Sequence, residues 1–415
     1  MFKKLFAIAA IAVLLILLFS FKKTEPEAGQ VTWWEVASID TMKYSRDVAR
    51  EKLNDPTFDE VIDRQISDIA ETGATHVAIA TPYDEEFNPF LRKWVKTARK
   101  NDLKVWFRGN FSGWEGWFGY PKISRDEHIK KTEEFVLKNK NLFEDGDIFT
   151  PCPECENGGP GDPRHNGDLA GHRKFLIDEY RLTKNKFKTI GKDVSSNYIS
   201  MNGDVAKLVM DRPTTSSLDG IVTIDHYVGD PEQLSKDIVQ IAQSSGGRIV
   251  LGEFGAPIPD IHGAMSEKQQ AEWINEALLQ LVNMDEVMGI NYWTNSGSSS
   301  QLWGNDGAKR EAADTLKSFY AVEVTTGEVE DEAGQALTGV YIFIGNKRYF
   351  TDSKGIFAFP RFASQTKVVF EAPGYKTREI DIDSDEINKV TLKKEVEDSW
   401  FKTRKFVNNI LNNFK

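Results

Sequence analysis

Two short motifs place glutamates directly after runs of strand-forming residues. The first spans residues 147–158 and contains Glu154 and Glu156, and the second spans residues 249–255 and contains Glu253. One carboxyl group that protonates a leaving oxygen and another that attacks the anomeric carbon together cleave a glycosidic bond. Retention of configuration requires a separation of about 5–5.5 Å. We therefore expect Glu154 and Glu253 to face each other across a cleft.

The elements that must position these carboxyls are eight short β-type runs. They are apolar and rich in β-branched and aromatic residues, as buried parallel strands are. Nearly every run ends in polar or aromatic residues, and this contrast with the apolar strands indicates a site at the strand ends and not packing alone. The runs are residues 31–38, 75–81, 103–109, 147–151, 194–200, 220–226, 248–253 and 287–293.

Longer amphipathic segments with helical periodicity alternate with these runs. A parallel strand pair needs a covering crossover, so eight strand–helix units predict an α/β fold, a (β/α)8 TIM barrel over residues 31–321. In such a barrel, function lies at the carboxyl ends of the strands. The predicted helices are residues 57–71, 90–100, 125–141, 171–187, 231–243, 267–283 and 308–319.

Several residues at these strand ends suit the support of a nucleophile or the binding of a sugar. Arg108 and Tyr227 can donate hydrogen bonds that keep Glu253 ionised. His226 and Asn197 are candidate contacts to the nucleophile or the sugar. Glu154 has to begin the reaction protonated, so a drier environment is expected around it.

The barrel segment resembles the clan of retaining (β/α)8 glycosidases that contains the glycoside hydrolase family 5 cellulases and mannanases. The resemblance covers residues 31–320 and is strongest in Gly252-Glu253-Phe254-Gly255, in Asn291-Tyr292-Trp293 and in the 301–307 loop. It implies that Glu154 is the acid/base, that Glu253 is the nucleophile and that Trp293 is a sugar platform. The implied reaction is hydrolysis of β-linked poly- or oligosaccharides.

The first motif departs from the clan pattern at one position. The clan has Asn before the acid/base, where it holds the sugar 2-hydroxyl, and this chain has Pro153. Glu156, which Asn157 follows, is therefore an alternative acid/base, although Glu154 fits the clan spacing without a gap. The rival function is a catalytically silent surface barrel that binds carbohydrate.

Tryptophans are candidates for stacking on sugar rings, and burial in the core is an equally good interpretation of each. The candidates include Trp33 and Trp303, beside Trp34, Trp114 and Trp117.

The two cysteines of the chain, Cys152 and Cys155, flank Glu154. Free thiols, a tight disulfide and a zinc site with His165 and His172 are all open, and free thiols are favoured because the histidine spacing is wide for zinc. No glycine-rich phosphate loop follows a strand. We expect no cofactor and no metal at the site.

The C-terminal part has β-type runs and turns without helical periodicity. Residues 322–394, through motifs at 327–342, 351–359 and 372–375, resemble carboxypeptidase regulatory-like domains. That resemblance implies a small all-β sandwich, transthyretin-like, with no chemistry of its own. Residues 395–415 can form an amphipathic helix that lies on a membrane or packs on a domain.

The N-terminus reads as an export signal. Lysines 3 and 4 precede an apolar run over residues 5–21, and an uncleaved signal anchor over residues 1–23 is favoured over a cleaved peptide. Residues 24–30 form a linker. We expect an extracytoplasmic, membrane-anchored monomer. A net charge of −11 argues against nucleic-acid partners.

Overall fold

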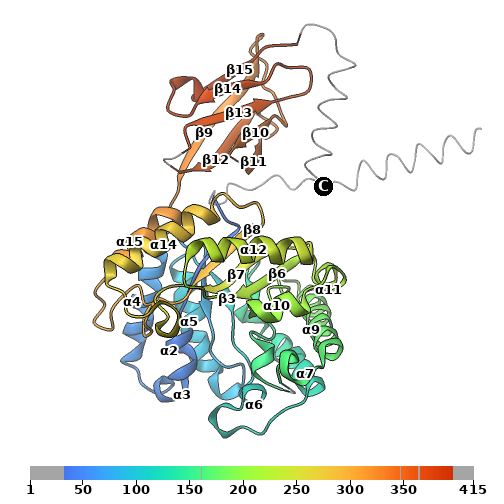
Figure 1. The fold of residues 1–415 in the computed structure, drawn as a ribbon, viewed down its shortest axis with the longest axis vertical. Coiled ribbons are helices and arrows are strands. Elements are labelled where there is room, and N and C mark those ends of the chain that lie inside the picture. The colour runs from blue at the N-terminus through green and yellow to red at the C-terminus, as the bar shows by residue number, and fades with distance from the viewer. Residues whose placement is uncertain (1–31, 160, 346, 363–364, 396–415) are drawn as a thin grey trace, which may run out of the picture. The chain divides into compact units, whose positions relative to one another are not determined.

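The computed structural model describes residues 32–159, 161–345, 347–362 and 365–395 (Figure 1). The chain forms two units: one comprises Thr32–Glu323 with Gly345–Lys347, and the other comprises Val324–Ile344 and the described residues from Arg348 on. The expected anchor at 1–23, the linker at 24–30 and all but residue 395 of the C-terminal helix lie outside the described residues. Among the helices of the described part, none has the length and apolar character to span a membrane.

The first unit is the predicted (β/α)8 barrel. Its parallel strands follow the order β4-β3-β2-β1-β8-β7-β6-β5, and a parallel bridge between Ile148 and Ser195 joins the two edges. The strands are β1 (Val36–Asp40), β2 (His76–Ile79), β3 (Lys104–Phe107), β4 (Ile148–Phe149), β5 (Ser200–Asn202), β6 (Ile221–Asp225), β7 (Arg248–Phe254) and β8 (Val287–Tyr292).

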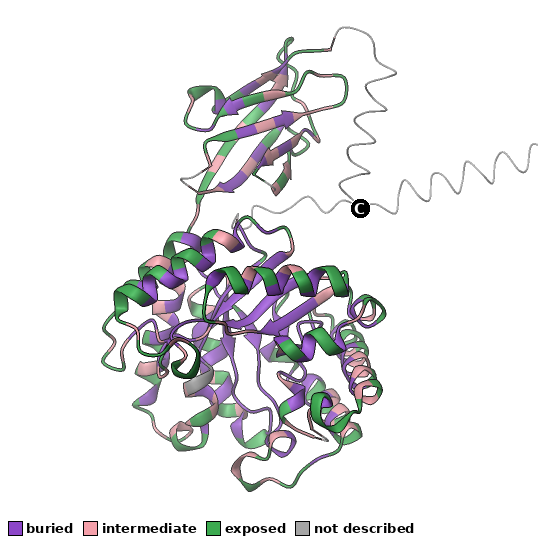
Figure 2. Cartoon of the chain, in the orientation of Figure 1, coloured by how far each residue is buried: buried purple, intermediate pink, exposed green. Residues whose placement is uncertain are grey.

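The strands form because apolar residues cover both of their faces. Figure 2 shows them buried, while the surrounding helices expose their outer sides. Alternate residues point into the barrel and fill it with bulky side chains, as a closed parallel barrel requires. The interior cluster consists of Val36, Ala78, Trp106, Ile148, Tyr198, Val250 and Met288.

Helices cover the barrel and begin at recognisable caps. The side chains of Ser124 and Asp230 accept hydrogen bonds from the first turns that follow them, and Ser266 forms a capping box with Gln269. The main helices are α4 (Phe58–Glu71), α5 (Asn88–Lys100), α7 (Arg125–Lys138), α9 (Leu169–Thr189), α12 (Pro231–Ser245), α14 (Glu267–Leu281) and α15 (Glu311–Tyr320). Shorter ones are α2 (Met42–Asp47), α3 (Ala49–Lys52), α6 (Ser112–Glu115), α8 (Pro163–Asn166), α10 (Gly203–Val209), α11 (Arg212–Ser217) and α13 (Pro259–His262).

The fifth strand is displaced from its predicted place. The prediction was 194–200, whereas β5 begins at Ser200. In the segment before it, polar side chains take up backbone groups that a regular ladder would use: the Thr150 hydroxyl donates to the Tyr198 carbonyl at 2.6 Å, and the Asn197 amide donates to the Leu218 carbonyl at 3.1 Å. Sequence periodicity does not reveal such side-chain competition.

The second unit is all-β, with two sheets of order β11-β10-β13-β14 and β12-β9-β15. Buried and exposed residues alternate along its strands, and the buried ones include Val329, Ile342, Phe359, Phe370 and Val390. The carboxypeptidase regulatory-like assignment stays a prediction. The strands are β9 (Glu323–Asp331), β10 (Tyr341–Ile344), β11 (Lys347–Phe350), β12 (Ile356–Arg361), β13 (Lys367–Glu371), β14 (Arg378–Asp381) and β15 (Lys389–Leu392).

Candidate active site

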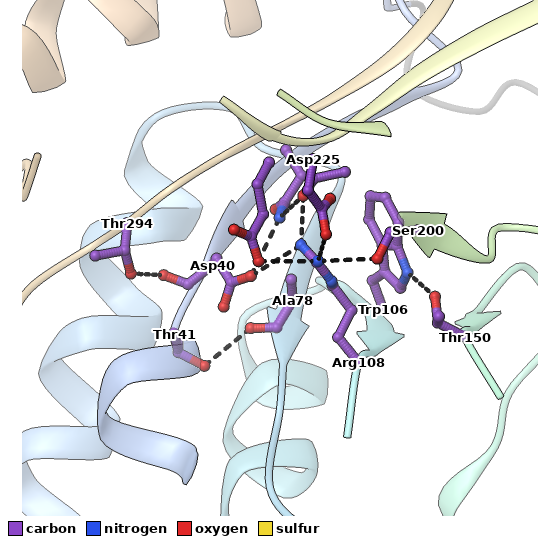
Figure 3. A network of polar contacts seen from close by, with 12 residues as sticks. Asp40, Thr41, Ala78, Trp106, Arg108, Thr150, Ser200, Asp225 and Thr294 are labelled. Atoms are coloured by element: carbon purple, nitrogen blue, oxygen red, sulfur yellow. Dashed lines mark hydrogen bonds and ion pairs between the residues drawn. The ribbon is translucent and has the colours of Figure 1, made fainter. Parts of the chain in front are cut away.

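A buried arginine joins four strands at the carboxyl end of the barrel. Arg108, which follows β3 and is 1 % exposed, donates to Asp40 Oδ2 at 3.1 Å, to Asp225 Oδ2 at 3.0 Å and to Glu253 Oε1 at 3.0 Å. It also donates to the Ser200 hydroxyl at 3.2 Å. Figure 3 shows the Arg108 guanidinium between Asp40 on β1, Asp225 on β6 and Ser200 on β5.

One buried cation among three carboxyl groups leaves this cluster short of positive charge. Burial lowers the pKa of Arg108, but Asp225, Glu253 and Asp40 outweigh that effect and raise it, so the guanidinium stays charged. Burial raises the pKa of Asp225 well above its usual range, and the charge of Glu253 adds to this, while Arg108 opposes it. The neutral form of Asp225 is therefore favoured.

Both oxygens of the Glu253 carboxyl are held in place. Arg108 donates to Oε1, and the Tyr227 hydroxyl donates to Oε2 at 2.8 Å. Burial, followed by the charge of Glu253, raises the pKa of Tyr227 well above its usual value, so the phenol remains a donor. Glu253 itself is 6 % exposed. The structure thus places two of the predicted supporting residues, Arg108 and Tyr227, on the predicted nucleophile.

An extra residue in β7 turns Glu253 toward the barrel mouth. Ile224 on β6 pairs with Leu251, but the next residue, Asp225, pairs with Glu253, so Gly252 has no partner of its own. Val250 faces the barrel interior, and in a regular strand Glu253 would face the helices instead. A bulge re-aims the side chain in this way.

The glycines on either side of Glu253 and Phe254 make room for the site. A Cβ on Gly252 would lie 2.4 Å from Asp225 Oδ1, and a Cβ on Gly255 would lie 2.4 Å from the Trp293 carbonyl oxygen. Trp293 follows β8 and is half-buried, so part of its surface remains open. Close packing around the carboxyl group therefore explains why Gly252 and Gly255 flank Glu253 and Phe254.

Glu154 lies in the loop that follows β4. Its backbone N–H donates to the Ser200 carbonyl at 2.8 Å. Burial, followed by the negative charges of Glu253 and Glu156, raises the pKa of Glu154 to about 7, against the opposing charges of Arg108 and Arg46. The charge of Glu253 therefore contributes to the raised pKa of Glu154.

The alternative acid/base, Glu156, has a different environment. It is 3 % exposed, and its Oε1 accepts hydrogen bonds from the backbone N–H of Asn202 at 2.7 Å and from the Asn202 amide at 3.2 Å. Burial raises its pKa, and the Asn202 backbone N–H opposes this. Glu156 thus ties the β4 loop to β5.

The two cysteines form a disulfide, so the favoured expectation of two free thiols was wrong. Cys152 and Cys155 are joined with a Cα–Cα distance of 5.4 Å. The sequence placed both in one short loop but did not show whether their side chains point toward each other, which is the requirement for a bond.

Four predicted contact residues are held elsewhere. His226 Nε2 lies 2.9 Å from Asp237 Oδ2 on α12, and only its backbone N–H reaches Glu253, at the carbonyl oxygen. Asn197 is 9 % exposed and binds the Leu218 carbonyl. Trp303 is 4 % exposed.

Trp33 is the fourth, and it precedes β1 at the amino-terminal ends of the strands. Its indole N–H donates to the Val282 carbonyl at 3.1 Å, and the residue is 5 % exposed. Glu253 lies at the opposite, carboxyl end of the barrel. The structure therefore does not bring Trp33 to the carboxyl pair.

Sequence reasoning missed a further glutamate, Glu115, whose pKa the charge of Glu154 raises. Burial raises the pKa of Glu115, at the end of α6, to about 8; Arg46 opposes this, and the charge of Glu154 contributes to it. The only sequence signal was its place among the tryptophans that follow the third strand.

A buried polar chain behind Glu115 was also missed. Asn110 Oδ1 accepts from the backbone N–H of Phe111 and lies 2.8 Å from His128 Nε2, and His128 Nδ1 lies 2.5 Å from Glu179 Oε1. His128 and Glu179 are both fully buried. His128 on α7 and Glu179 on α9 meet only through tertiary packing, so no local sequence pattern predicts their contact.

No protein-family model and no curated protein sequence matches this chain. Several solved structures are similar to it. A variant of a GH5_18 protein from Bifidobacterium longum subsp. longum, in complex with Manb1-4GlcNAc, is similar with a TM-score of 0.52 and 14 % identity over 73 % of this chain and 84 % of that one. This likeness shows the (β/α)8 fold.

Two β-glucuronidases are similar over less of their length. The enzyme from Ruminococcus gnavus has a TM-score of 0.45 and 14 % identity, covering 63 % of this chain and 46 % of that one. The enzyme from Dictyoglomus thermophilum has a TM-score of 0.44 and 17 % identity, covering 63 % and 47 %. The chain thus spans less than half of these proteins.

Replacing Arg108 with Met tests the buried charge cluster. The substitution leaves Asp40, Asp225 and Glu253 buried without their cation, which should lower the free energy of unfolding by about 3–5 kcal/mol. Urea unfolding at pH 7 measures this. Arg248→Met is the control, because Arg248 pairs with Glu35 at the surface, with side chains 49 % and 58 % exposed, and such pairs contribute about 0–1 kcal/mol.

The loss in free energy of unfolding caused by Arg108→Met should also depend on pH. Without the opposing charge of Arg108, burial and the charge of Glu253 raise the folded-state pKa of Asp225 still further above its unfolded value, so the folded state binds more protons and its stability falls as pH rises. The loss in Arg108→Met should therefore be smaller at pH 5 than at pH 7.5. Equal losses for the two arginine variants, or no pH dependence, would contradict the cluster.

Proposed function

We propose that the protein is a retaining glycoside hydrolase that cleaves β-linked poly- or oligosaccharides, with Glu253 as nucleophile and Glu154 as acid/base. One observation carries this proposal: the charge of one carboxyl group acts on the other, yet the two groups have different surroundings. Glu253 accepts hydrogen bonds from a charged guanidinium and a phenol, whereas burial and neighbouring charges raise the pKa of Glu154 to about 7. Such a difference in surroundings supports Glu253 as the nucleophile and Glu154 as the acid/base.

The reaction has two steps. Glu253 attacks the anomeric carbon while Glu154 donates its proton to the leaving oxygen, and a glycosyl-enzyme ester forms. The ester has no negative charge, so one of the influences that raise the pKa of Glu154 disappears. Glu154 then accepts a proton from the water that attacks the ester, and both carboxyls return to their starting states.

Aromatic residues at the mouth of the barrel support the proposal that the substrate is a carbohydrate. Trp293 is half-buried beside Gly255, and Trp117, after α6, is also half-buried. Indole faces stack on sugar rings and present edges that stay solvated. A GH5_18 protein of similar fold was solved with Manb1-4GlcNAc, so β-mannosides belong among the first probes.

We also propose that the barrel works outside the cytoplasm, tethered by residues 1–23. The basic and apolar start of the sequence supports this, and so does the disulfide, since such bonds persist in oxidising compartments. Membrane fractionation of the full chain and of a chain lacking residues 1–23 tests the tether.

Turnover of aryl β-glycosides and of glucan, mannan, xylan and galactan tests the activity. Glu253→Gln should show no detectable turnover, because an amide cannot attack the anomeric carbon. Glu154→Gln should lose about 10²–10⁴-fold on substrates with poor leaving groups. Glu232→Gln is the matched control: Glu232 lies on α12 with a side chain 72 % exposed, and its activity should equal that of the parent.

The parent's results distinguish this proposal from the rival. Binding to a polysaccharide in a pull-down assay, without turnover of any probe, would establish the catalytically silent carbohydrate-binding barrel instead. Pro153, in the position where the clan has Asn, is the feature that favours this rival.

The pH profile offers a separate test. Glu154 must hold a proton to act as acid, and its pKa is about 7, so kcat/KM should fall as pH rises through about 7. Glu154→Gln, assayed on a 2,4-dinitrophenyl glycoside that needs no acid, should lose this alkaline limb. An unchanged limb in the variant would assign the titration to another group.

A further inference from the structure

The proposed acid/base lies inside a disulfide ring. Cys152 and Cys155 are bonded to each other, and Glu154 is one of the two residues between them. Both cysteines are buried, at 0 % and 2 % exposed. The bond therefore closes the very loop that carries the proton donor.

The two carboxyl groups differ in how they are held. Glu253 receives a hydrogen bond on each oxygen, from Arg108 and from Tyr227. Across the described residues, no side chain or backbone N–H donates to the Glu154 carboxyl at hydrogen-bond distance. Its position consequently depends on its own backbone.

That backbone has a conformation that needs support. Glu154 has φ 44° and ψ 53°, in the left-handed region that non-glycine residues seldom adopt. Its N–H donates to the Ser200 carbonyl at 2.8 Å, and its own carbonyl accepts from the Asn157 N–H at 2.9 Å. Such conformations persist where the surroundings hold them, and here the cross-link is the covalent part of those surroundings.

We propose that the Cys152–Cys155 disulfide is a positioning element that aims Glu154 at the leaving oxygen, so that opening the bond disables acid catalysis while leaving nucleophilic attack by Glu253 intact. The inference rests on the proposed function. Opening is a two-electron reduction: a phosphine such as TCEP takes up one oxygen from water to become the phosphine oxide, and the two sulfurs each gain a hydrogen.

The groups that face Glu154 come from several elements, and all of them stay when the bond opens. Glu253 on β7 and Glu156 in the same loop raise its pKa, while Arg108 after β3 and Arg46 on α2 lower it. The charge of Glu154 also contributes to the raised pKa of Glu115 on α6. A change in acid catalysis on opening would therefore come from displacement of Glu154 and not from loss of a charge.

Leaving-group dependence separates positioning from general damage. We would compare the parent with Cys152→Ala/Cys155→Ala on two glycosides of the sugar that the activity screen identifies, one with a methylumbelliferyl and one with a 2,4-dinitrophenyl leaving group. Formation of the glycosyl-enzyme from the methylumbelliferyl glycoside needs the proton of Glu154, whereas its formation from the activated dinitrophenyl glycoside does not. Misplacement of a reacting group by about 1 Å can cost 10²-fold. We expect kcat/KM to fall about 10–100-fold on the first substrate and less than about 3-fold on the second.

Reduction of the parent provides the second measurement if the double variant fails to fold. The chain has only these two cysteines, so any effect of TCEP on activity has to act through this bond. Alkylation and intact mass report the fraction that is open, and near-ultraviolet circular dichroism reports the fold. The double variant, when folded, is the matched control and should not respond to TCEP.

The outcomes are distinct. Equal activity of open and closed forms on the poor leaving group would overturn the positioning role and leave the hydrolase intact. Equal losses on both substrates would also overturn it, since they would indicate general damage to the site. If the closed parent cleaves no probe at all, the proposed function fails first.

Discussion

The structure depends on one buried cation. Arg108 binds carboxyl groups delivered by β1, β6 and β7, and it reaches β5 through Ser200. A charge with so little exposure is tolerable only when carboxylates pair with it and accept its hydrogen bonds, as they do at the two terminal nitrogens of Arg108. The pairing fixes the strand ends relative to one another, and so the stability of the barrel mouth and the orientation of Glu253 have the same cause.

An electrostatic asymmetry follows from that arrangement. Arg108 lies against Glu253 and acts on Glu154 only as an opposing influence, weaker than burial and the neighbouring negative charges. In the proposed mechanism the first carboxyl attacks, and the second, whose pKa is about 7, supplies the proton. In that mechanism, esterification of Glu253 would remove one of the charges that raise the pKa of Glu154, so that Glu154 could then act as a base. The surroundings of the two glutamates thus differ, and the proposed division of roles rests on that difference.

Much of this could be predicted from the sequence, because the relevant signals are local. Strand–helix alternation predicted the barrel, and the strand ends pointed to Arg108, Tyr227, Glu154 and Glu253. Other features depend on tertiary contacts: the start of β5 at Ser200, the extra residue at Gly252, and the direction of the His226 ring toward Asp237. Trp33 and Trp303 are apolar enough for either core or cleft, and only burial decides between these places.

The central claim is that Glu253 and Glu154 act as nucleophile and acid/base on one sugar ring. Proton NMR of a β-glycoside during hydrolysis tests it most directly, because the first anomer released records the geometry of attack. Two inversions at the same carbon predict that the β-anomer appears first and then mutarotates. Release of the α-anomer first would mean a single displacement by water, and the account of Glu253 as a nucleophile would be wrong.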